Sequence, residues 1–132
     1  MGKSRLNSYQ KGQKGEKRAA AFLRLRGYRI LERNYRVSQG EIDLVAKKGD
    51  TLVFVEVKTR KDDSHGAPIE AVSPLKVRRV SAAAAVYLAQ NQMNFTACRF
   101  DIVAVGPEKN WLGWPKVQHF ENAFSVAEHF NI

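Results

Sequence analysis

Apolar and polar residues alternate with two different periods along the chain, and the change of period marks the expected elements. Residues 11–26 carry an apolar face at helical spacing through Ala20 and Leu23, and Gly27 follows as a typical helix stop. Three runs rich in β-branched residues then alternate with period two. They predict consecutive strands at residues 28–37, 41–46 and 51–58.

The second half of the chain begins with a strong helix start. Ser73 suits an N-cap and Pro74 suits the first helical position, so a helix is expected from there to about Asn91. A strand is predicted at residues 98–105, and a helix of this length between two strands predicts a parallel crossover. The remaining elements are expected to be a loop, a short edge strand and a terminal amphipathic helix, at residues 106–115, 116–121 and 122–130. Together these elements predict an α/β fold with a mixed central sheet flanked by helices.

The turn between the second and third strands decides which side chains meet. A tight turn centred on Lys48 and Gly49 would make paired residue numbers sum to about 97. Asp43 would then lie opposite Phe54 and diagonal to Glu56 on the same face, with Cα atoms about 7–8 Å apart. A register with an even sum would place the two acids on opposite faces, so the prediction depends on the turn.

Three acids are directed toward one place by this pattern. Glu16 shares a helix face with Ala20, while Asp43 and Glu56 lie on the two hairpin strands, and Lys58 shares the face of Glu56. Carboxylate oxygens are the ligands that Mg²⁺ or Mn²⁺ prefers, and such an ion supports hydrolysis of phosphate esters. A purely structural role is the alternative to a metal site. Glu16 would then be an acid in an early helical turn, favoured by the helix dipole, and Glu56 and Lys58 would form a charged strand end with ordinary ion pairs.

The positive charge is confined to the start of the chain. Residues 1–36 contain eleven Lys or Arg and two acids, whereas residues 37–132 contain eleven of each. A local basic block is typical of proteins that bind a phosphate backbone, although a solvated helix face with a basic tail would carry the same charge. We expect residues 1–10 to be a flexible basic tail and residues 11–132 to form a single domain.

Composition excludes several classes of protein. No apolar run approaches the roughly 20 residues that cross a bilayer, and the basic start lacks the apolar region of a secretory signal. Cys98 is the only cysteine, and together these features predict a cytoplasmic protein without a membrane partner. We expect Trp111 and Trp114 to cover an edge of the core, with stacking on nucleic-acid bases as the alternative.

Several short motifs together resemble the YraN family of uncharacterised bacterial proteins. These motifs are Gly12-x-x-Gly15-Glu16, Gly40-Glu41-Ile42-Asp43-Leu44, Val53-Phe54-Val55-Glu56-Val57-Lys58-x-Arg60, Lys76 and Arg99-Phe100-Asp101. The resemblance covers the chain from Gly12 to about Val105. It implies a restriction-endonuclease-like fold with an α-β-β-β-α-β core.

The acidic set is also similar, more distantly, to that of archaeal Holliday-junction resolvases. Carried over to this chain, the resemblance makes Glu16, Asp43 and Glu56 metal ligands and Lys58 the catalytic lysine. Ile42 stands before Asp43 where the resolvase signature has a proline. Glu41 is an additional acid that could bind the metal or serve only the turn.

The expected function is a Mg²⁺- or Mn²⁺-dependent nuclease that hydrolyses phosphodiester bonds in DNA, with branched or damaged DNA as candidate substrates. The alternative is a non-catalytic nucleic-acid-binding or partner-recruiting module on the same fold. A small-molecule enzyme is less favoured, because the chain has no glycine-rich phosphate loop and no recognisable nucleophile–base pair. A homodimer is a further expectation. The candidate nucleic-acid-binding residues are Lys14, Lys17, Arg18, Arg36, Arg60, Lys61 and Lys76.

Overall fold

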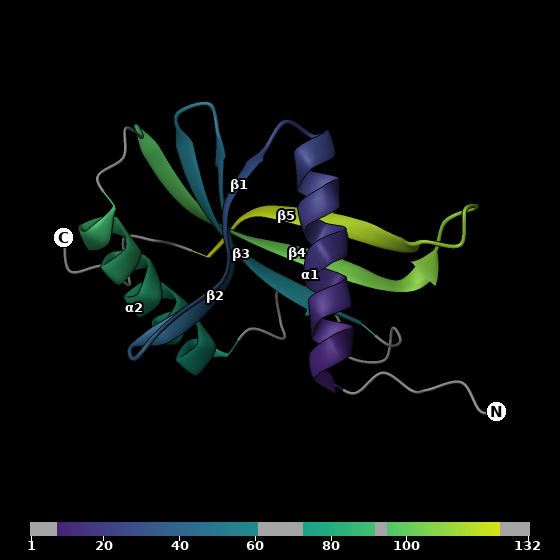
Figure 1. Cartoon of the computed structure of the whole chain (residues 1–132), viewed down its shortest axis with the longest axis horizontal. Coiled ribbons are helices and arrows are strands. Elements are labelled where there is room, and N and C mark those ends of the chain that lie inside the picture. Colours follow the sequence, from purple (N-terminus) through teal and green to yellow (C-terminus); the bar gives the residue numbers. More distant parts are fainter. Residues whose placement is uncertain (1–7, 61–72, 92–94, 125–132) are drawn as a thin grey trace.

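The computed structural model describes residues 8–60, 73–91 and 95–124, which form a five-stranded sheet and two helices (Figure 1). The elements follow one another as α1 (Ser8–Leu25), β1 (Arg29–Val37), β2 (Gly40–Lys48), β3 (Thr51–Thr59), α2 (Pro74–Gln90), β4 (Ala97–Lys109) and β5 (Pro115–Phe124). The predicted α/β class and the α-β-β-β-α-β order are confirmed, and β5 extends the sheet by one strand.

The strands lie in the sheet in the same order as in the chain. β1, β2 and β3 form an antiparallel meander, β4 pairs parallel to β3, and β5 returns antiparallel to β4. The predicted crossover through α2 is confirmed. Because β3 and β4 are parallel, with Thr59 opposite Val105, their carboxyl ends lie at the same edge of the sheet.

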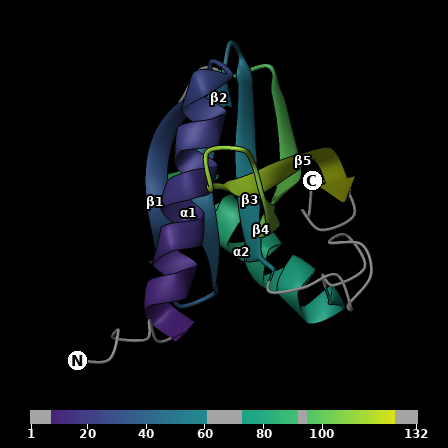
Figure 2. The same ribbon diagram turned by 90° about the vertical axis from the view of Figure 1, so that its right-hand side faces the viewer.

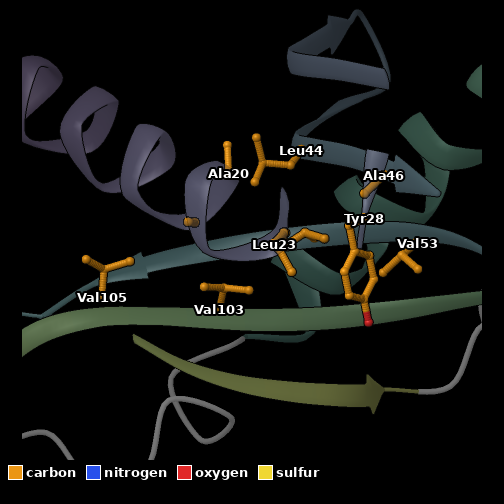
Figure 3. Packing of buried hydrophobic residues seen from close by; sticks show 10 residues of the cluster. Ala20, Leu23, Tyr28, Leu44, Ala46, Val53, Val103 and Val105 are labelled. Atoms are coloured by element: carbon orange, nitrogen blue, oxygen red, sulfur yellow. The ribbon is translucent and has the colours of Figure 1, made fainter. Parts of the chain in front are cut away.

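The two helices cover opposite faces of the sheet (Figure 2). Leu23 of α1 is fully buried in one core together with Val53 and Val55 of β3 (Figure 3). Phe54 points to the other face, where it packs in a second core with Ala84 of α2. Alternation along β3 therefore separates the two cores. In the described part of the chain, neither helix is long and apolar enough to cross a membrane.

The start of α2 agrees with the prediction. Ser73 is the N-cap, and its Oγ accepts a hydrogen bond from the backbone N–H of Lys76 at 3.1 Å. Pro74 occupies the first turn, where its missing N–H leaves no bond unmade. This cap fixes the first turn of α2, and with it the place from which Lys76 leaves the helix.

The β2–β3 hairpin differs from the predicted register. Lys48 pairs with Thr51 and Val45 pairs with Phe54, so paired residue numbers sum to 99 and the tight turn is Gly49-Asp50. The reason is Gly49, which has a φ of 58° and occupies the first turn position rather than the second. The prediction of Phe54 opposite Asp43 is therefore wrong. The ladder ends at Leu44 and Val55 and so pairs neither Asp43 nor Glu56, but its odd sum is the one that a shared face for these two acids requires.

The C-terminal predictions need three corrections. β4 continues to Lys109 and β5 begins at Pro115, so much of the expected loop is a hairpin. Residues 122–124 belong to β5 rather than to a helix, and the rest of the predicted terminal helix lies outside the described residues. Trp111 and Trp114 are 90% and 55% exposed, so the expectation that they cover the core is wrong.

Candidate functional site

Glu16, Asp43 and Glu56 come from α1, β2 and β3, and Asp43 is the member that contacts the other two. Its carboxyl group is within hydrogen-bonding reach of Glu16 on one hand and of Glu56 on the other. The three elements that the sequence assigned to these acids thus bring them together at one edge of the sheet.

Asp43 is held in place by the backbone of the neighbouring strand. The ladder between β2 and β3 stops at Leu44 and Val55, which leaves the N–H of Val57 without a partner on β2. Asp43 Oδ2 accepts a hydrogen bond from that N–H at 2.8 Å. The carboxylate therefore replaces a missing strand bond and is fixed beside Glu56.

Two glycines of the family motifs allow the elements to approach one another. A Cβ atom on Gly15 would lie 2.0 Å from the Oγ1 of Thr59, so α1 packs directly against the end of β3. A Cβ atom on Gly40 would lie 1.9 Å from the backbone oxygen of Arg79, so β2 starts in contact with α2. These contacts position Glu16 and Asp43, which follow the two glycines closely in sequence.

The acids strongly disfavour being ionised together. Burial and the charge of Asp43 raise the pKa of Glu56 to about 8, and the same two causes raise the pKa of Glu16 to about 7. The pKa of Asp43 is also raised, chiefly by burial, although the Val57 N–H and the charge of Lys76 oppose the shift. Such a cluster retains protons near neutral pH or takes up a cation in their place.

Two lysines lie beside the acids. The Nζ of Lys76 is 3.3 Å from Glu56 Oε1 and 3.7 Å from Glu41 Oε1. Burial alone would lower the pKa of Lys76, but Glu56 and Asp43 outweigh it and raise the pKa. Lys58 is half-buried on β3, and its charge acts to lower the pKa of Glu56. Sequence reasoning placed Lys76 with the phosphate-binding residues and missed its ion pairs, since residue spacing relates no position of α2 to β3.

The three carboxylates are of the chemical type that binds a divalent cation, but they are not arranged as a ready metal site. Glu56 is 4% exposed, and its Oε2 is buried with no hydrogen-bond partner, so one oxygen is left over for a ligand. Among the described residues, however, no three Asp, Glu, His or Cys side chains form a ready metal-binding group. The charge of Lys76 already compensates that of Glu56. To bind a metal ion, Glu56 would have to give up its ion pair with Lys76.

The candidate nucleic-acid-binding residues fall into separate groups. Lys76 and Arg36 lie at the acids, since Arg36 Nε is 4.0 Å from Glu41 Oε2. Lys14 and Arg18 face the β4–β5 hairpin instead, where both line one cavity. Lys17 is exposed on α1, and Arg60 is half-buried just after β3. Lys61 lies outside the described residues.

A second buried polar cluster connects β5 and Tyr28, which precedes β1, to β4. Asp101 is fully buried and accepts hydrogen bonds from Arg99 at 3.0 Å and from the Asn122 N–H at 2.9 Å. Its other oxygen lies 2.7 Å from Nε2 of His119, and Arg99 also contacts the hydroxyl of Tyr28. The Arg99-Phe100-Asp101 motif is therefore accounted for by packing and hydrogen bonding away from the three acids.

Comparisons with known proteins agree with the resemblance noted in the motifs. The sequence model described as "Uncharacterised protein family UPF0102" matches residues 15–105. A UPF0102 protein of Anaeromyxobacter dehalogenans is 49% identical over 113 residues, which cover 86% of this chain and 82% of that one. The UPF0102 protein of Geotalea daltonii is 46% identical over 116 residues, 88% of this chain and 90% of its own length. That of Dictyoglomus turgidum is 43% identical over 121 residues, 90% of this chain and 100% of its own.

One solved structure with a weaker likeness is that of Pyrococcus furiosus SfsA in complex with Ca²⁺. It has 16% sequence identity and a TM-score of 0.38, over 87% of this chain and 64% of that one. A likeness of this size supports no conclusion about the site. The family match and the relatives, which span most of the chain, establish that the chain belongs to the uncharacterised family UPF0102, the YraN family that its motifs resemble.

Proposed function

We propose that this protein is a Mg²⁺- or Mn²⁺-dependent nuclease that hydrolyses phosphodiester bonds in DNA. The observation that carries the proposal is the contact of Asp43 with both Glu16 and Glu56, with a buried oxygen of Glu56 left without a partner. Packing alone gives no reason to gather three mutually repelling carboxyl groups at one place, with Glu56 buried and the other two half-buried.

In this proposal the three carboxylates hold the metal ion, and Lys58 lies next to the phosphate. The ion, when bound, polarises a phosphoryl oxygen and lowers the pKa of a water molecule. Asp43 keeps its orientation through the hydrogen bond that its Oδ2 accepts from the Val57 N–H, which holds the carboxylate beside Glu56. Lys58, two residues beyond Glu56, places a positive charge beside the negative charge that develops on phosphate.

The lysine and arginine side chains would lower the repulsion between the acids and an incoming phosphate. Lys76 already neutralises part of the charge on Glu56 and Glu41, and Arg36 neutralises part of that on Glu41. The excess of positive charge in residues 1–36 would attract the rest of the phosphate backbone.

A non-catalytic module that binds nucleic acid or recruits a partner is the second candidate. The ion pairs of Lys76 favour it, because they supply a counter-charge for Glu56 from within the protein. The absence of a ready metal-binding group among the described residues points the same way. In that case the acids would serve the packing of α2 on the sheet edge.

Cleavage assays separate the two candidates. The substrates are linear duplex, single-stranded, flapped and four-way-junction DNA, plus structured RNA, each incubated with Mg²⁺, Mn²⁺ or EDTA. The nuclease proposal expects cutting that needs the metal and is abolished by Asp43→Asn and by Glu56→Gln. Glu32→Gln changes an exposed acid of β1 and should leave cutting intact. Binding that falls with salt but never leads to cutting would establish the module instead.

The proposal includes a homodimer acting in the reducing cytoplasm. Two cuts placed symmetrically in a branched substrate require two sites related by symmetry. Light scattering at several protein concentrations, with and without the substrate that is cut, measures the state directly. A monomer that remains monomeric on that substrate would remove the dimer from the proposal.

A further inference from the structure

The β4–β5 hairpin exposes large apolar side chains to solvent, and hydrogen bonds within its loop fix the shape of this exposed segment. β4 and β5 are paired as far as Lys109 and Pro115, and Figure 1 shows their hairpin projecting past α1. Within the loop, Asn110 Oδ1 accepts from the N–H groups of Leu112 at 2.9 Å and Trp114 at 3.1 Å. The Asn110 N–H donates to the Trp114 oxygen at 2.8 Å. The loop is therefore a self-bonded turn with a defined shape.

The exposed side chains of this loop are of the kind that bind bases. Trp111 is 90% exposed, Trp114 is 55% exposed and Leu112 is 51% exposed. Three large hydrophobic side chains are thus exposed within four consecutive residues, and exposed apolar patches of this kind often mark interaction sites. Indole rings stack on any nucleobase, because every base presents a π-face.

Positive charge lies at the base of the hairpin. A cavity of about 400 Å³ separates the first half of α1 from the hairpin, and its charged lining residues are Lys14, Arg18 and Lys109. Among the described residues that line this cavity there is no acid. The nearby Glu108 is paired with Lys116, with 3.3 Å between Oε2 and Nζ. The volume is within the range of about 300–1,000 Å³ that holds small ligands.

Arg18 joins the basic cavity to the aromatic loop. Its guanidinium carbon lies 5.2 Å from the centre of the Trp114 ring, and its Nε–H donates to the Pro115 oxygen at 3.2 Å. Together these contacts hold Trp114 in one orientation against α1. A positive charge and an aromatic face are thus presented side by side, as a nucleotide requires.

The cavity also adjoins the acids. Gly15 and Thr59 both line it, and they are the immediate sequence neighbours of Glu16 and Lys58. Figure 2 shows the hairpin loop on the same side of the molecule as α1. A strand that occupied the cavity would therefore continue toward Glu16 and its neighbours.

We propose that the hairpin loop, residues 110–114, and this basic cavity bind an unpaired segment of DNA. Bases stack on Trp111 and Trp114, and phosphates lie against Lys14, Arg18 and Lys109. The protein consequently prefers single-stranded or locally unpaired DNA to uninterrupted duplex, in which stacked bases cannot reach the rings. Only the role of this segment in presenting a phosphodiester bond to the acids rests on the proposed nuclease function.

Binding is measured in EDTA, where no metal-dependent cutting occurs. The two tryptophans of the hairpin are the only ones in the chain, so quenching of tryptophan fluorescence by a single-stranded oligonucleotide reports contact with this loop. Anisotropy of a labelled oligonucleotide and of its duplex gives the two affinities. We expect Trp111→Ala to weaken single-strand binding about 5- to 100-fold, with duplex binding little changed. Trp111→Phe should restore most of the loss, and Leu25→Ala, which removes another exposed apolar side chain, should have no effect.

The outcomes distinguish this inference from the proposed nuclease. Quenching and loss of single-strand affinity without cutting under any metal would keep the inference and reject the nuclease. Metal-dependent cutting with unchanged affinity of Trp111→Ala and Trp114→Ala would do the reverse. If the two substitutions instead convert a dimer to a monomer in light scattering and leave oligonucleotide binding unchanged, the loop contacts a second copy and the inference is overturned.

Discussion

Glu56→Gln is expected to stabilise the metal-free protein at pH 8, although it removes an ion pair with Lys76. Gln is neutral at every pH and can donate a hydrogen bond to Asp43, as the protonated Glu56 does. Glu56 is buried, and both this burial and Asp43 oppose its ionisation. The substitution therefore removes a charge that the folded protein disfavours.

The magnitude follows from the pKa of the group in the two states. Raising the pKa of Glu56 from 4.5 to about 8 corresponds to at most about 5 kcal/mol. Asp43 shares the repulsion, and the 3.3 Å contact with Lys76 is lost, so we expect a gain of about 1–3 kcal/mol. Between these pKa values the folded state binds more protons than the unfolded state. The contribution of Glu56 to the free energy of unfolding therefore decreases from pH 5 to pH 8.

Urea unfolding in EDTA at pH 5, 6.5 and 8 tests this expectation. The difference between Glu56→Gln and the wild type should be small at pH 5 and grow with pH, while Glu32→Gln follows the wild type throughout. Adding Mg²⁺ or Mn²⁺ should raise the Tm of the wild type at pH 8 and not that of Glu56→Gln. If the difference in unfolding free energy between Glu56→Gln and the wild type stays constant or shrinks as pH rises, Glu56 is not a buried acid whose ionisation destabilises the fold.

Four further predictions concern packing, charge and reactivity. Gly40→Ala would place a Cβ atom against the backbone of Arg79 and should cost about 2 kcal/mol or more in urea unfolding. Gly12→Ala, which meets nothing within 4 Å in α1, should instead stabilise by about 0.5–1 kcal/mol. The pKa of Asp101 is lowered overall. Burial acts to raise it, but the hydrogen bonds from His119, Arg99 and the Asn122 N–H outweigh burial. The stability that Asp101 contributes is therefore lost only as pH falls below about 4. Asp101→Asn should cost about 3–5 kcal/mol at pH 7 and remove this part of the acid unfolding curve; an unchanged curve would contradict the prediction. Burial raises the pKa of the Cys98 thiol to about 11, so a thiol reagent at pH 8 should label the native protein far more slowly than the urea-unfolded one.

The elements of the fold could be predicted from the sequence because each carries a local cause. Ser73 and Pro74 form a cap through their own side chains, and α2 begins where they predict. The alternating residues of β3 separate two cores, as period-two patterning requires. The assignment of the three acids to α1, β2 and β3 needed only these periods.

The meeting of the acids was predicted only in part. The face shared by Asp43 and Glu56 depends on whether the register sum is odd, and a turn centred one position away preserves it. The residue opposite Asp43 depends on which turn position Gly49 occupies. A single sequence allows either choice, since Gly suits both positions.

Only the tertiary structure decided the contacts between distant segments. Lys76 pairs with Glu56 because α2, which packs on β2, brings its first turn within reach of this β3 side chain. The bare backbone of Gly40 lets β2 meet α2 at Arg79. The exposure of Trp111 depends on how far β4 and β5 extend beyond the core. The sequence by itself determined the helices, the strands and their buried faces, because backbone propensity and side-chain period act over a few neighbouring residues. The partners of each charged or aromatic side chain were decided by packing between elements, which no local pattern encodes.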